Sequence, residues 1–324
     1  MSTYTHTILI TGGTSGLGYE ATAILARHYK DAKVIIASRR DPDSAATKIN
    51  QHNGQKNVEF LPLDLGSQEN IRTFVKTWEH QKFPPISALL FNAGLQFPDR
   101  LVFTSDGIET TFGVNHVGHA LLFYLLQPHL ADEARIIVVA SGTHDPAQKT
   151  GMPDAVYTSG EELAHPPRGK AVNGAGRQRY TTSKLCNVLW TYALDRRVRQ
   201  LAPTKKWTVA AFDPGLMPGT GLAREAGPVL RFIWHHIFPT LIPLLRRVFH
   251  HNIHTPKQSG GNLAFLVTDA TVRAKSGVYY EIRKEIPSSV DSYVEAKQEE
   301  LWSWTVKTLA SNEQERKNFE VVSS

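Results

Sequence analysis

Tyr180 and Lys184 are spaced so that their side chains can cooperate in moving a proton. They lie four residues apart in a stretch with helical periodicity, which places both on one face of a helix, one turn apart. A phenol in water has a pKa of about 10, too high for easy proton exchange at neutral pH. A nearby ammonium group favours the phenolate. We therefore expect Tyr180 to act as general acid or base on a carbonyl or an alcohol.

Ser141 and Asn115 are candidates to assist this pair. Ser141 follows an apolar run that predicts a buried strand, so we expect its hydroxyl to polarise a substrate oxygen. Asn115, in the sequence Val-Asn-His, is expected to hold a water molecule beside Lys184 and complete a proton path. A Tyr-x-x-x-Lys pair alone is weak evidence, because many helices begin with these residues by chance. The Asp-Pro-Gly turn at 213–215 strengthens the assignment, since its backbone can close on a bound ring.

A glycine-rich turn near the N-terminus has the composition of a diphosphate-binding loop. The sequence Thr-Gly-Gly-Thr-Ser-Gly-Leu-Gly at 11–18 follows a short apolar run and precedes a helical pattern. Glycines let the chain turn sharply and let a pyrophosphate approach the free N–H groups at the start of the helix. The predicted contacts are Gly12, Thr14, Ser15, Gly16, Leu17 and Gly18.

The end of the second apolar run indicates which dinucleotide would bind. Sites for an unphosphorylated adenosine ribose usually place an acidic residue here, whereas this chain has Ser38, Arg39 and Arg40. A guanidinium can bind a 2′-phosphate bidentately, and a carboxylate would repel it. We therefore expect NADP(H), with Arg39 as the main contact and Arg40 beside it. The alternative is a solvated pair of arginines before a turn.

Further cofactor contacts are expected where the later strands end. An acid after the third run can accept from the adenine amino group, and a small Ala-Gly turn after the fourth lets the backbone lie against the cofactor. The Pro-Gly turn would close on the nicotinamide, whose positive charge when oxidised also favours the Tyr180 phenolate, and Thr220 would bind its carboxamide. The predicted contacts are Asp64, Leu65, Asn92, Ala93, Gly94, Pro214, Gly215 and Thr220, together with Tyr180 and Lys184.

These residues need a scaffold, and the chain alternates short apolar runs with longer helical patterns. This alternation predicts an α/β fold, a doubly wound parallel sheet of about seven strands covered by helices. The predicted strands are Thr7–Thr11, Val34–Ala37, Val58–Leu63, Ala88–Phe91, Ile136–Ala140, Val209–Phe212 and Gly277–Tyr280. The predicted helices are Gly18–Tyr29, Asp43–His52, Gln68–Thr77, Gly107–Leu126, Tyr180–Leu201, Ser259–Val267 and Val290–Ala310, followed by a polar tail expected to fray.

Two segments break the alternation, and we expect both to form lids within a single domain spanning 1–324. Segment 143–179 is rich in Pro, Gly and charge, and segment 221–256 is apolar, aromatic and punctuated by prolines. Both follow strand ends on the side where such sheets bind ligands. The residues expected to line a pocket for a bulky apolar substrate are Leu222, Phe232, Trp234, Phe238 and Leu241. The alternative is that these side chains pack only against protein.

The overall composition excludes several classes of protein. The chain has 324 residues, 41% of them hydrophobic, and a formal net charge of +6. Its Lys and Arg residues are scattered, which argues against a nucleic-acid partner. The single cysteine, Cys186, excludes an intrachain disulfide. Together with an N-terminus that lacks a signal-peptide pattern, it favours the cytoplasm.

The apolar region Val229–Phe249 is interrupted by Arg, His and Pro, so no transmembrane segment is expected. Its arginines leave open a peripheral contact with an anionic membrane surface, and homo-oligomer formation is also open. The histidines of this part lack carboxylates or cysteines at metal-ligand spacing, so we expect no metal. They are His235, His236, His250, His251 and His254.

The ordered motifs TGGTSGLG, DL, NAG, NHVGH, VVAS, YTTSK, DPG and SGVYY resemble the short-chain dehydrogenase/reductase family over nearly the whole chain. The resemblance implies a Rossmann-type fold and an Asn115, Ser141, Tyr180, Lys184 tetrad. NHVGH, SKLCNVL and PGLMPGTGLARE are similar to the branch that contains retinol dehydrogenases and light-dependent protochlorophyllide reductases. The latter carry a cysteine directly after the Pro-Gly turn, where this chain has Leu216.

The sequence therefore favours an NADPH-dependent reductase or dehydrogenase that interconverts a bulky hydrophobic ketone or aldehyde and its alcohol. One alternative is reduction of a conjugated C=C bond, which Leu216 disfavours. A second is a nucleotide-binding sensor or scaffold without turnover, which the intact tetrad disfavours.

Overall fold

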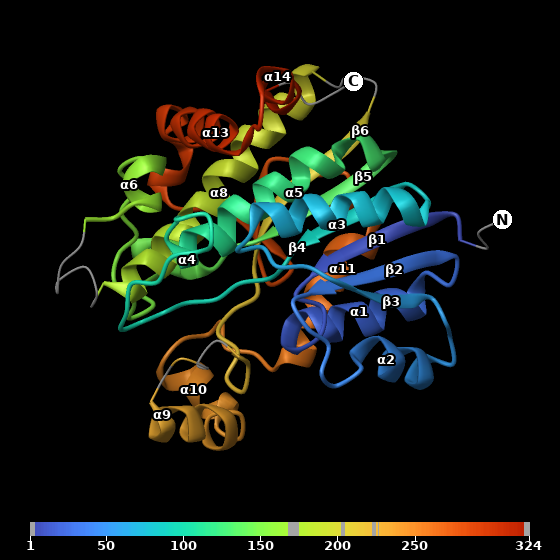
Figure 1. Ribbon diagram of the computed structural model, residues 1–324. Helices are drawn as coiled ribbons and strands as arrows, with labels where there is room; N and C mark the ends of the chain where they lie inside the picture. Colours follow the sequence, from blue (N-terminus) through green and yellow to red (C-terminus); the bar gives the residue numbers. More distant parts are fainter. Residues whose placement is uncertain (1–3, 168–174, 202–204, 222–224, 226, 321–324) are drawn as a thin grey trace.

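Seven apolar runs of the sequence become neighbouring strands of one parallel sheet. The computed structural model describes residues 4–167, 175–201, 205–221, 225 and 227–320. The strand order is β3-β2-β1-β4-β5-β6-β7-β8, and β1 to β7 run parallel (Figure 1). The strands are β1 (His6–Thr11), β2 (Ala32–Ser38), β3 (Val58–Pro62), β4 (Ile86–Phe91), β5 (Leu130–Val139), β6 (Lys206–Asp213), β7 (Val278–Glu281) and β8 (Lys284–Ile286). The predicted Rossmann-type fold is confirmed.

The eighth strand was not predicted. β8 pairs antiparallel with β7 through a tight turn in which Ile282 has φ +59°. It has three residues, Lys-Glu-Ile, so it offers neither the length nor the apolar run by which the other strands are recognised. Its two charged side chains suit an edge strand, because charge at a sheet edge opposes pairing with another chain.

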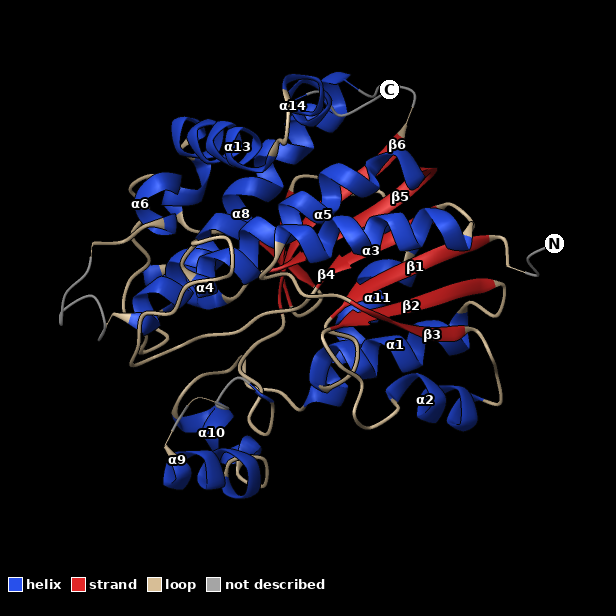
Figure 2. Ribbon diagram, in the orientation of Figure 1, coloured by secondary structure: helices blue, strands red, loops and turns tan. Residues whose placement is uncertain are grey.

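Alternate residues of the strands face two helical layers, shown on either side of the sheet in Figure 2. Ile8 and Ile10 of β1 pack in the core that includes residues of α1, α2 and α11, whereas Leu9 packs with α3, α5 and α8. Burial on both faces explains why the strands are almost continuously apolar. These helices are α1 (Gly16–His28), α2 (Ala45–Asn53), α3 (Gln68–Gln81), α5 (Gly118–Leu126), α8 (Gly176–Leu201) and α11 (Pro256–Thr268).

The helix predicted at Gly107–Leu126 begins later and contains a wide turn. Gly107 has φ +79°, which a helix does not tolerate, and the chain becomes helical at α4 (Thr110–Phe112). The π-helical turn η1 (Gly113–Val117) then leads into α5. Turns of this kind are frequent at functional sites, and Asn115 lies in this one.

The C-terminal tail is helical as far as Glu320, so the expectation that this part frays was wrong, and residues 321–324 lie outside the described part. Beyond η7 (Val290–Tyr293) and α13 (Glu295–Leu309), α14 (Glu313–Glu320) packs back on the molecule. Phe319 is buried and stacks on Tyr124, with ring centroids 4.8 Å apart. Arg72 of α3 forms an ion pair with Glu315, with Nη1 and Oε1 2.6 Å apart. α14 looks polar in sequence because Phe319 is its single apolar residue.

The two irregular segments contain short helices. The first holds η3 (Gly142–His144), η4 (Pro146–Gln148) and α6 (Gly160–Ala164), and residues 168–174 of it lie outside the described part. The second holds α9 (Pro228–Phe232), the π-helical turn η6 (Ile233–Ile237) and α10 (Ile242–Val248). Figure 1 shows α9 and α10 standing apart from the sheet and its two helical layers. The remaining short elements are η2 (Gln127–His129) and α12 (Ala270–Arg273). Within the described residues, no helix has both the length and the apolar character needed to cross a membrane.

Candidate active site

A cavity of about 1570 Å³ opens at the carboxyl ends of the parallel strands. Residues that directly follow β1 to β6 line it, which is where doubly wound sheets bind ligands. Drug-sized ligands usually occupy about 300–1,000 Å³, so the cavity has room for a dinucleotide and a second molecule. Every predicted cofactor contact lines it: Gly12, Thr14, Ser15, Gly16, Leu17, Gly18, Arg39, Arg40, Asp64, Leu65, Asn92, Ala93, Gly94, Tyr180, Lys184, Pro214, Gly215 and Thr220.

The glycine-rich turn leaves space that side chains would fill. Gly12 has φ +69° and Gly16 has φ +54°, which favour glycine. A Cβ on Gly18 would collide with the carbonyl oxygen of Gly12. Thr14 Oγ1 donates a hydrogen bond to Ser38 Oγ at 3.2 Å, which ties the turn to the end of β2. The turn opens α1, so its shape fits a diphosphate at a helix N-terminus.

Asn92 links the ends of β1 and β4, the neighbouring strands between which the strand order changes direction. Its Nδ2 donates to the carbonyl oxygens of Thr11 at 2.7 Å and Gly12 at 3.2 Å. Its backbone N–H donates to Thr11 Oγ1 at 2.9 Å. Asn92 therefore fixes the glycine-rich turn against the end of β4, and its side-chain nitrogen is used within the protein.

Arg39 and Arg40 lie at the end of β2, exposed and on the cavity wall. Within the described part of the chain, neither guanidinium forms an ion pair. Asp64, at the end of β3, accepts a hydrogen bond from the Gly66 N–H at 2.9 Å. Because the guanidinium groups of Arg39 and Arg40 are exposed and form no ion pair within the described residues, they are suited to bind an anionic group.

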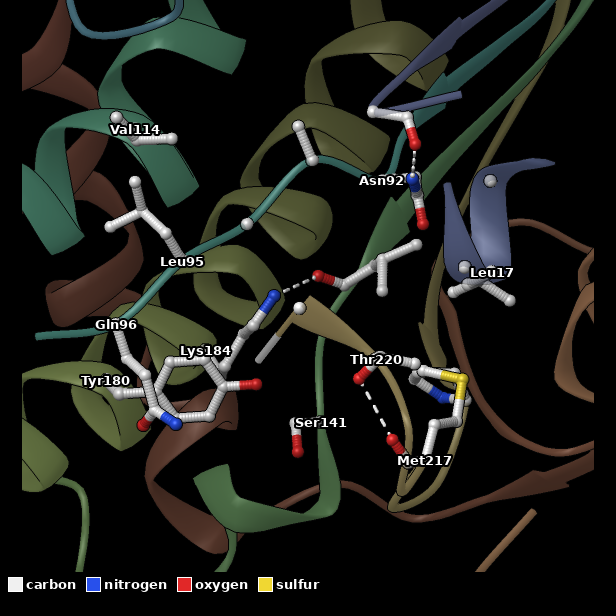
Figure 3. Close-up of a pocket in the computed structure, with 18 of the residues that line it drawn as sticks. Leu17, Asn92, Leu95, Gln96, Val114, Ser141, Tyr180, Lys184, Met217 and Thr220 are labelled. Carbon is white, nitrogen blue, oxygen red and sulfur yellow. Dashed lines mark hydrogen bonds between the residues drawn. The ribbon is translucent and has the colours of Figure 1, made fainter. Parts of the chain in front are cut away.

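Tyr180 and Lys184 lie one turn apart on α8, and Figure 3 shows them on one wall of the cavity. Lys184 Nζ is 5.7 Å from the centroid of the Tyr180 ring and donates to the Val139 carbonyl oxygen at 2.9 Å. Burial lowers the pKa of Lys184 to about 8, against an opposing effect of Asp213.

The pKa of Tyr180 is raised, contrary to the expectation from its ammonium neighbour. Burial is the largest cause and the Asp213 carboxylate adds to it, while a hydrogen bond with Ser141 acts in the opposite direction. The Lys184 ammonium does not offset these effects. Tyr180 is therefore a neutral phenol in the protein alone, which is the form that can donate a proton.

Ser141 follows β5 and lines the cavity near Tyr180 (Figure 3). Its carbonyl oxygen bonds to Nδ1 of His144 at 2.7 Å, and Nε2 of the same ring accepts from the backbone N–H of Ser289 at 3.1 Å. The buried imidazole thus fixes the turn that carries Ser141. The hydroxyl of Ser141 remains on the cavity side.

Asn115 lies behind the wall and does not line the cavity. Its Nδ2 donates to the Leu95 carbonyl oxygen and to Ser183 Oγ, both at 3.0 Å, and its Oδ1 accepts from the Leu95 N–H at 2.8 Å. Asn115 therefore braces the loop after β4 against α8. A Cβ on Gly94 would lie 3.4 Å from Asn115 Oδ1 and 3.6 Å from Lys184 Nζ, so both atoms border the space beside that glycine.

Asp213, at the end of β6, is a buried carboxylate to which the sequence pattern assigned no role. Oδ1 accepts from the Gly215 N–H at 2.9 Å, and Oδ2 accepts from Asn252 Nδ2 at 2.8 Å. The N–H of Gly142, next to Ser141, also bonds to this carboxylate. Asp213 therefore ties together three segments of the cavity wall.

The charge of Asp213 reaches Tyr180 and Lys184. Burial raises its pKa to about 6; the neighbouring Glu281 carboxylate adds to the rise, and hydrogen bonds from Gly215 and Gly142 oppose it. Asp213 in turn raises the pKa of both Tyr180 and Lys184. Sequence reasoning took Asp-Pro-Gly as a turn, because Asp is an ordinary turn residue and its burial depends on Asn252, 39 residues away.

The second irregular segment supplies part of the expected apolar wall. Trp234 and Phe238 line the cavity, together with Leu245 and Phe249, which were not predicted. Phe232 and Leu241 do not line it, and Leu222 lies outside the described residues. The helical turns of this segment point successive large side chains in different directions, which composition alone does not resolve.

The first irregular segment is anchored at one end. The hydroxyl of Tyr157 and the N–H of Gly160 both donate to the Glu300 carboxylate of α13. Trp304 Nε1 donates to Glu161 at 3.0 Å. The residues of this segment that line the cavity are Thr143, Thr150, Gly151, Met152 and Arg177.

Cys186 of α8 is fully buried in the core, and burial raises the pKa of its thiol well above the ordinary value. Among the described residues there is no cluster of three His, Cys, Asp or Glu side chains arranged to hold a metal ion. His251 instead contacts Glu281, with Nε2 and Oε2 3.1 Å apart.

The family model for short chain dehydrogenases matches residues 6–159. The chain is 31% identical over 296 residues to a chloroplastic protochlorophyllide reductase of Daucus carota, covering 87% of this chain and 71% of that protein. It is 30% identical over 304 residues to the polyprenol dehydrogenase of Homo sapiens, covering 91% and 82%.

Solved structures show the same fold at lower sequence identity. A protein of Mycobacterium paratuberculosis superposes with a TM-score of 0.63 at 22% identity, over 95% of this chain and 94% of that one. A short-chain dehydrogenase of Shigella flexneri complexed with NADP gives a TM-score of 0.59 at 19% identity, over 87% and 99%. With the glycine-rich turn and the Ser141, Tyr180, Lys184 constellation at one cavity, these similarities show that the chain belongs to the short-chain dehydrogenase family of NAD(P)(H)-dependent oxidoreductases.

Proposed function

We propose that this protein uses NADP(H) to interconvert a bulky hydrophobic ketone or aldehyde and its alcohol. The observation that best supports this proposal is the convergence of Ser141, Tyr180 and Lys184 on one cavity wall, beyond the glycine-rich turn. A nicotinamide bound here would supply or accept the hydride. In reduction, the neutral Tyr180 phenol donates its proton to the substrate oxygen, which Ser141 also binds. In oxidation, the tyrosine takes that proton back.

Lys184 and Asn115 have supporting roles in this proposal. With a pKa of about 8, Lys184 is mostly an ammonium at neutral pH and stabilises the tyrosinate left after proton transfer. Asn115 fixes α8 through Ser183, and the proton path runs through a water in the space beside Gly94, between Asn115 Oδ1 and Lys184 Nζ. Asn115 is thus a positioning residue that touches neither cofactor nor substrate.

The choice of NADP(H) over NAD(H) rests on Arg39 and Arg40, two cavity-lining guanidinium groups at the point where NAD-binding sites carry an acid. Replacing Arg39 by Ala removes a charge-assisted hydrogen bond of about 1.5–3 kcal/mol. NADPH affinity should then fall by roughly one to two orders of magnitude, and NADH affinity should stay unchanged, as titration of nucleotide fluorescence would show. Equal losses for both nucleotides would assign Arg39 a structural role.

The proposed substrate class follows from the wall formed by Trp234, Phe238, Leu245 and Phe249. We propose that the parts of 143–179 and 221–256 at the cavity act as lids of one domain that spans 1–324. A cytoplasmic site of action is also proposed, since the single thiol is buried and unpaired.

The test is NADPH oxidation with a panel of carbonyl compounds of increasing apolar size. We expect kcat/KM to rise with apolar bulk, and Trp234→Ala to raise KM for bulky substrates more than for a small aldehyde. A preference for small polar carbonyls, or no turnover with any carbonyl, would contradict the proposal.

Reduction of a conjugated C=C bond is the second candidate, because several of the relatives are protochlorophyllide reductases. Leu216, which lines the cavity directly after the Pro-Gly turn, cannot donate a proton. An assay with an α,β-unsaturated ketone separates the two reactions. Reduction of the C=C bond yields the saturated ketone, whereas reduction of the carbonyl yields the allylic alcohol.

A further inference from the structure

The segment from α9 to α10 exposes an unusual share of the large apolar side chains. Of the twelve large hydrophobic residues that are exposed in the described part of the chain, seven lie between Val229 and Phe249. Those at least 40% exposed form what we call the apolar face: Val229, Phe232, Ile237, Leu244, Val248 and Phe249. The exposed fraction reaches 75% at Val248. Apolar side chains gathered in this way usually mark a surface that is covered in use.

The same segment is basic. No Asp or Glu occurs between Glu225 and Asp269 in the sequence, whereas Arg231, Arg247 and Lys257 are exposed in this interval. Exposed cations beside apolar side chains match an anionic bilayer surface. The cations are attracted to the headgroups, and the apolar groups leave water for the acyl boundary.

The apolar face is continuous with the cavity wall. Trp234, Phe238 and Leu245 come from the same helical turns and line the cavity, and Phe249 belongs to both sets. A Cβ on Gly151 would lie 3.8 Å from Phe249 Cζ, so this ring also meets the cavity end of the first irregular segment. Whatever covers the apolar face therefore lies at the mouth of the cavity.

We propose that the apolar face is a docking surface for an anionic phospholipid bilayer. Arg231 and Arg247 contact lipid phosphates, and Phe232 and Val248 enter the acyl boundary. An apolar molecule dissolved in the bilayer then reaches the cavity along a path lined by aromatic side chains, without crossing bulk water. The docking requires neither a particular substrate nor turnover, so it stands apart from the proposed chemistry.

The test is cosedimentation of the full chain with vesicles of phosphatidylcholine containing about 30 mol% phosphatidylserine, against phosphatidylcholine alone. We expect binding to the anionic vesicles that weakens with salt. Replacing Arg231 and Arg247 by Gln together should weaken it roughly 30-fold. Replacing Phe232 and Val248 by Ser together should weaken it at least about tenfold.

Matched controls distinguish docking from general changes in charge or solubility. Val290→Ser removes an apolar side chain that is 87% exposed on η7, and Lys48→Gln with Lys76→Gln removes two exposed charges from α2 and α3. Both should bind vesicles like the unaltered chain. Failure of the unaltered chain to bind anionic vesicles would overturn the proposal. A different outcome would assign the apolar face to a second copy of the chain instead. In that case the unaltered chain would not bind vesicles and would sediment as a homodimer, and the Phe232→Ser/Val248→Ser variant would sediment as a monomer.

Discussion

Among the single residues of the site, Asp213 carries a calculable cost to the fold. Its pKa rises from 3.8 to about 6 when it is buried. At neutral pH that difference corresponds to about 3 kcal/mol of lost folding free energy. The carboxylate remains despite this cost, and it bonds to the Ser141 turn, the Pro-Gly turn and Asn252. We infer that the site keeps this costly carboxylate because it requires a negative charge behind Tyr180 and Lys184.

Asp213→Asn should therefore change the pH dependence of stability. Because the folded pKa lies above the unfolded one, the free energy of unfolding falls as pH rises from about 4 to about 6. The Asn variant lacks this fall, so its free energy of unfolding relative to that of the unaltered chain should rise by about 1–3 kcal/mol between pH 4 and pH 8. Urea unfolding at the two pH values measures the difference. Asp43→Asn, at an exposed site, keeps Asp213 and should follow the unaltered chain at both pH values.

The same variant should alter the pH profile of catalysis. Asp213 raises the pKa of Tyr180 and of Lys184, so its removal lowers both. Alcohol oxidation, which needs the tyrosinate, should then reach half its maximum roughly one pH unit lower. An unchanged profile beside altered stability would restrict Asp213 to a structural role.

Tyr180→Phe removes the transferable proton and leaves the ring in place. Turnover should fall by about 10²–10⁴-fold, while the Kd for NADPH stays near that of the unaltered chain. Steady-state kinetics and a fluorescence titration give the two values. Retention of full activity would show that another group transfers the proton.

At the scale of elements, the C-terminal helix closes the layer that holds the catalytic helix. α14 packs on Tyr124 of α5 through Phe319, and α13 packs on α8 through Trp302, which stacks on Trp190 at 6.2 Å between centroids. Arg197 of α8 lies over Trp302, with Cζ 4.1 Å from the ring centroid. The tail of the chain thus supports the position of Tyr180 from behind.

Phe319→Ala should lower the free energy of unfolding by about 3 kcal/mol, because it leaves a cavity beside Tyr124. Urea unfolding is the measurement. Phe232→Ala serves as the matched control, since that ring is 59% exposed and its loss should change stability little. A small effect at Phe319 would mean that α14 detaches readily in solution.

Most of this architecture could be predicted from the sequence because parallel strands buried on both faces have a strong apolar signature. Strand ends then placed Gly12 and Ser141 at one cavity, and the helical spacing placed Lys184 beside Tyr180. The parts that could not be predicted depend on distant partners: β8 is recognised only by its pairing with β7, and α14 only by Phe319 on Tyr124. The side-chain directions of Phe232 and Leu241, and the burial of Asp213 by Asn252, depend on distant packing in the same way.

At the scale of the whole molecule, the sheet and its two helical layers form a compact body, and the segment from α9 to α10 is less buried than this body. Buried core residues dominate α8, whereas much of 228–249 is exposed. Local opening is least costly where apolar contacts are few. A segment of this kind can close on a ligand without disturbing the catalytic helix.

Hydrogen exchange should therefore be faster in 228–249 than in 180–200 when no ligand is bound. NADPH with a hydrophobic carbonyl should slow exchange in 228–249 and leave 180–200 unchanged. Mass spectrometry of peptic fragments resolves the two regions. Slow exchange in 228–249 that ligands do not change would place this segment in the core.

Because Cys186 is buried, the rate at which its thiol is alkylated can measure how often the protein opens. The only sulfhydryl of the chain lies two residues after Lys184, fully buried on α8, with its pKa raised by burial. Iodoacetamide reacts with thiolate, so the folded enzyme should keep full activity in its presence. Alkylation can then proceed only when α8 leaves the sheet, and its rate counts those openings. Ligands, pH values or bilayers that stabilise α8 should each slow the alkylation of the Cys186 sulfur.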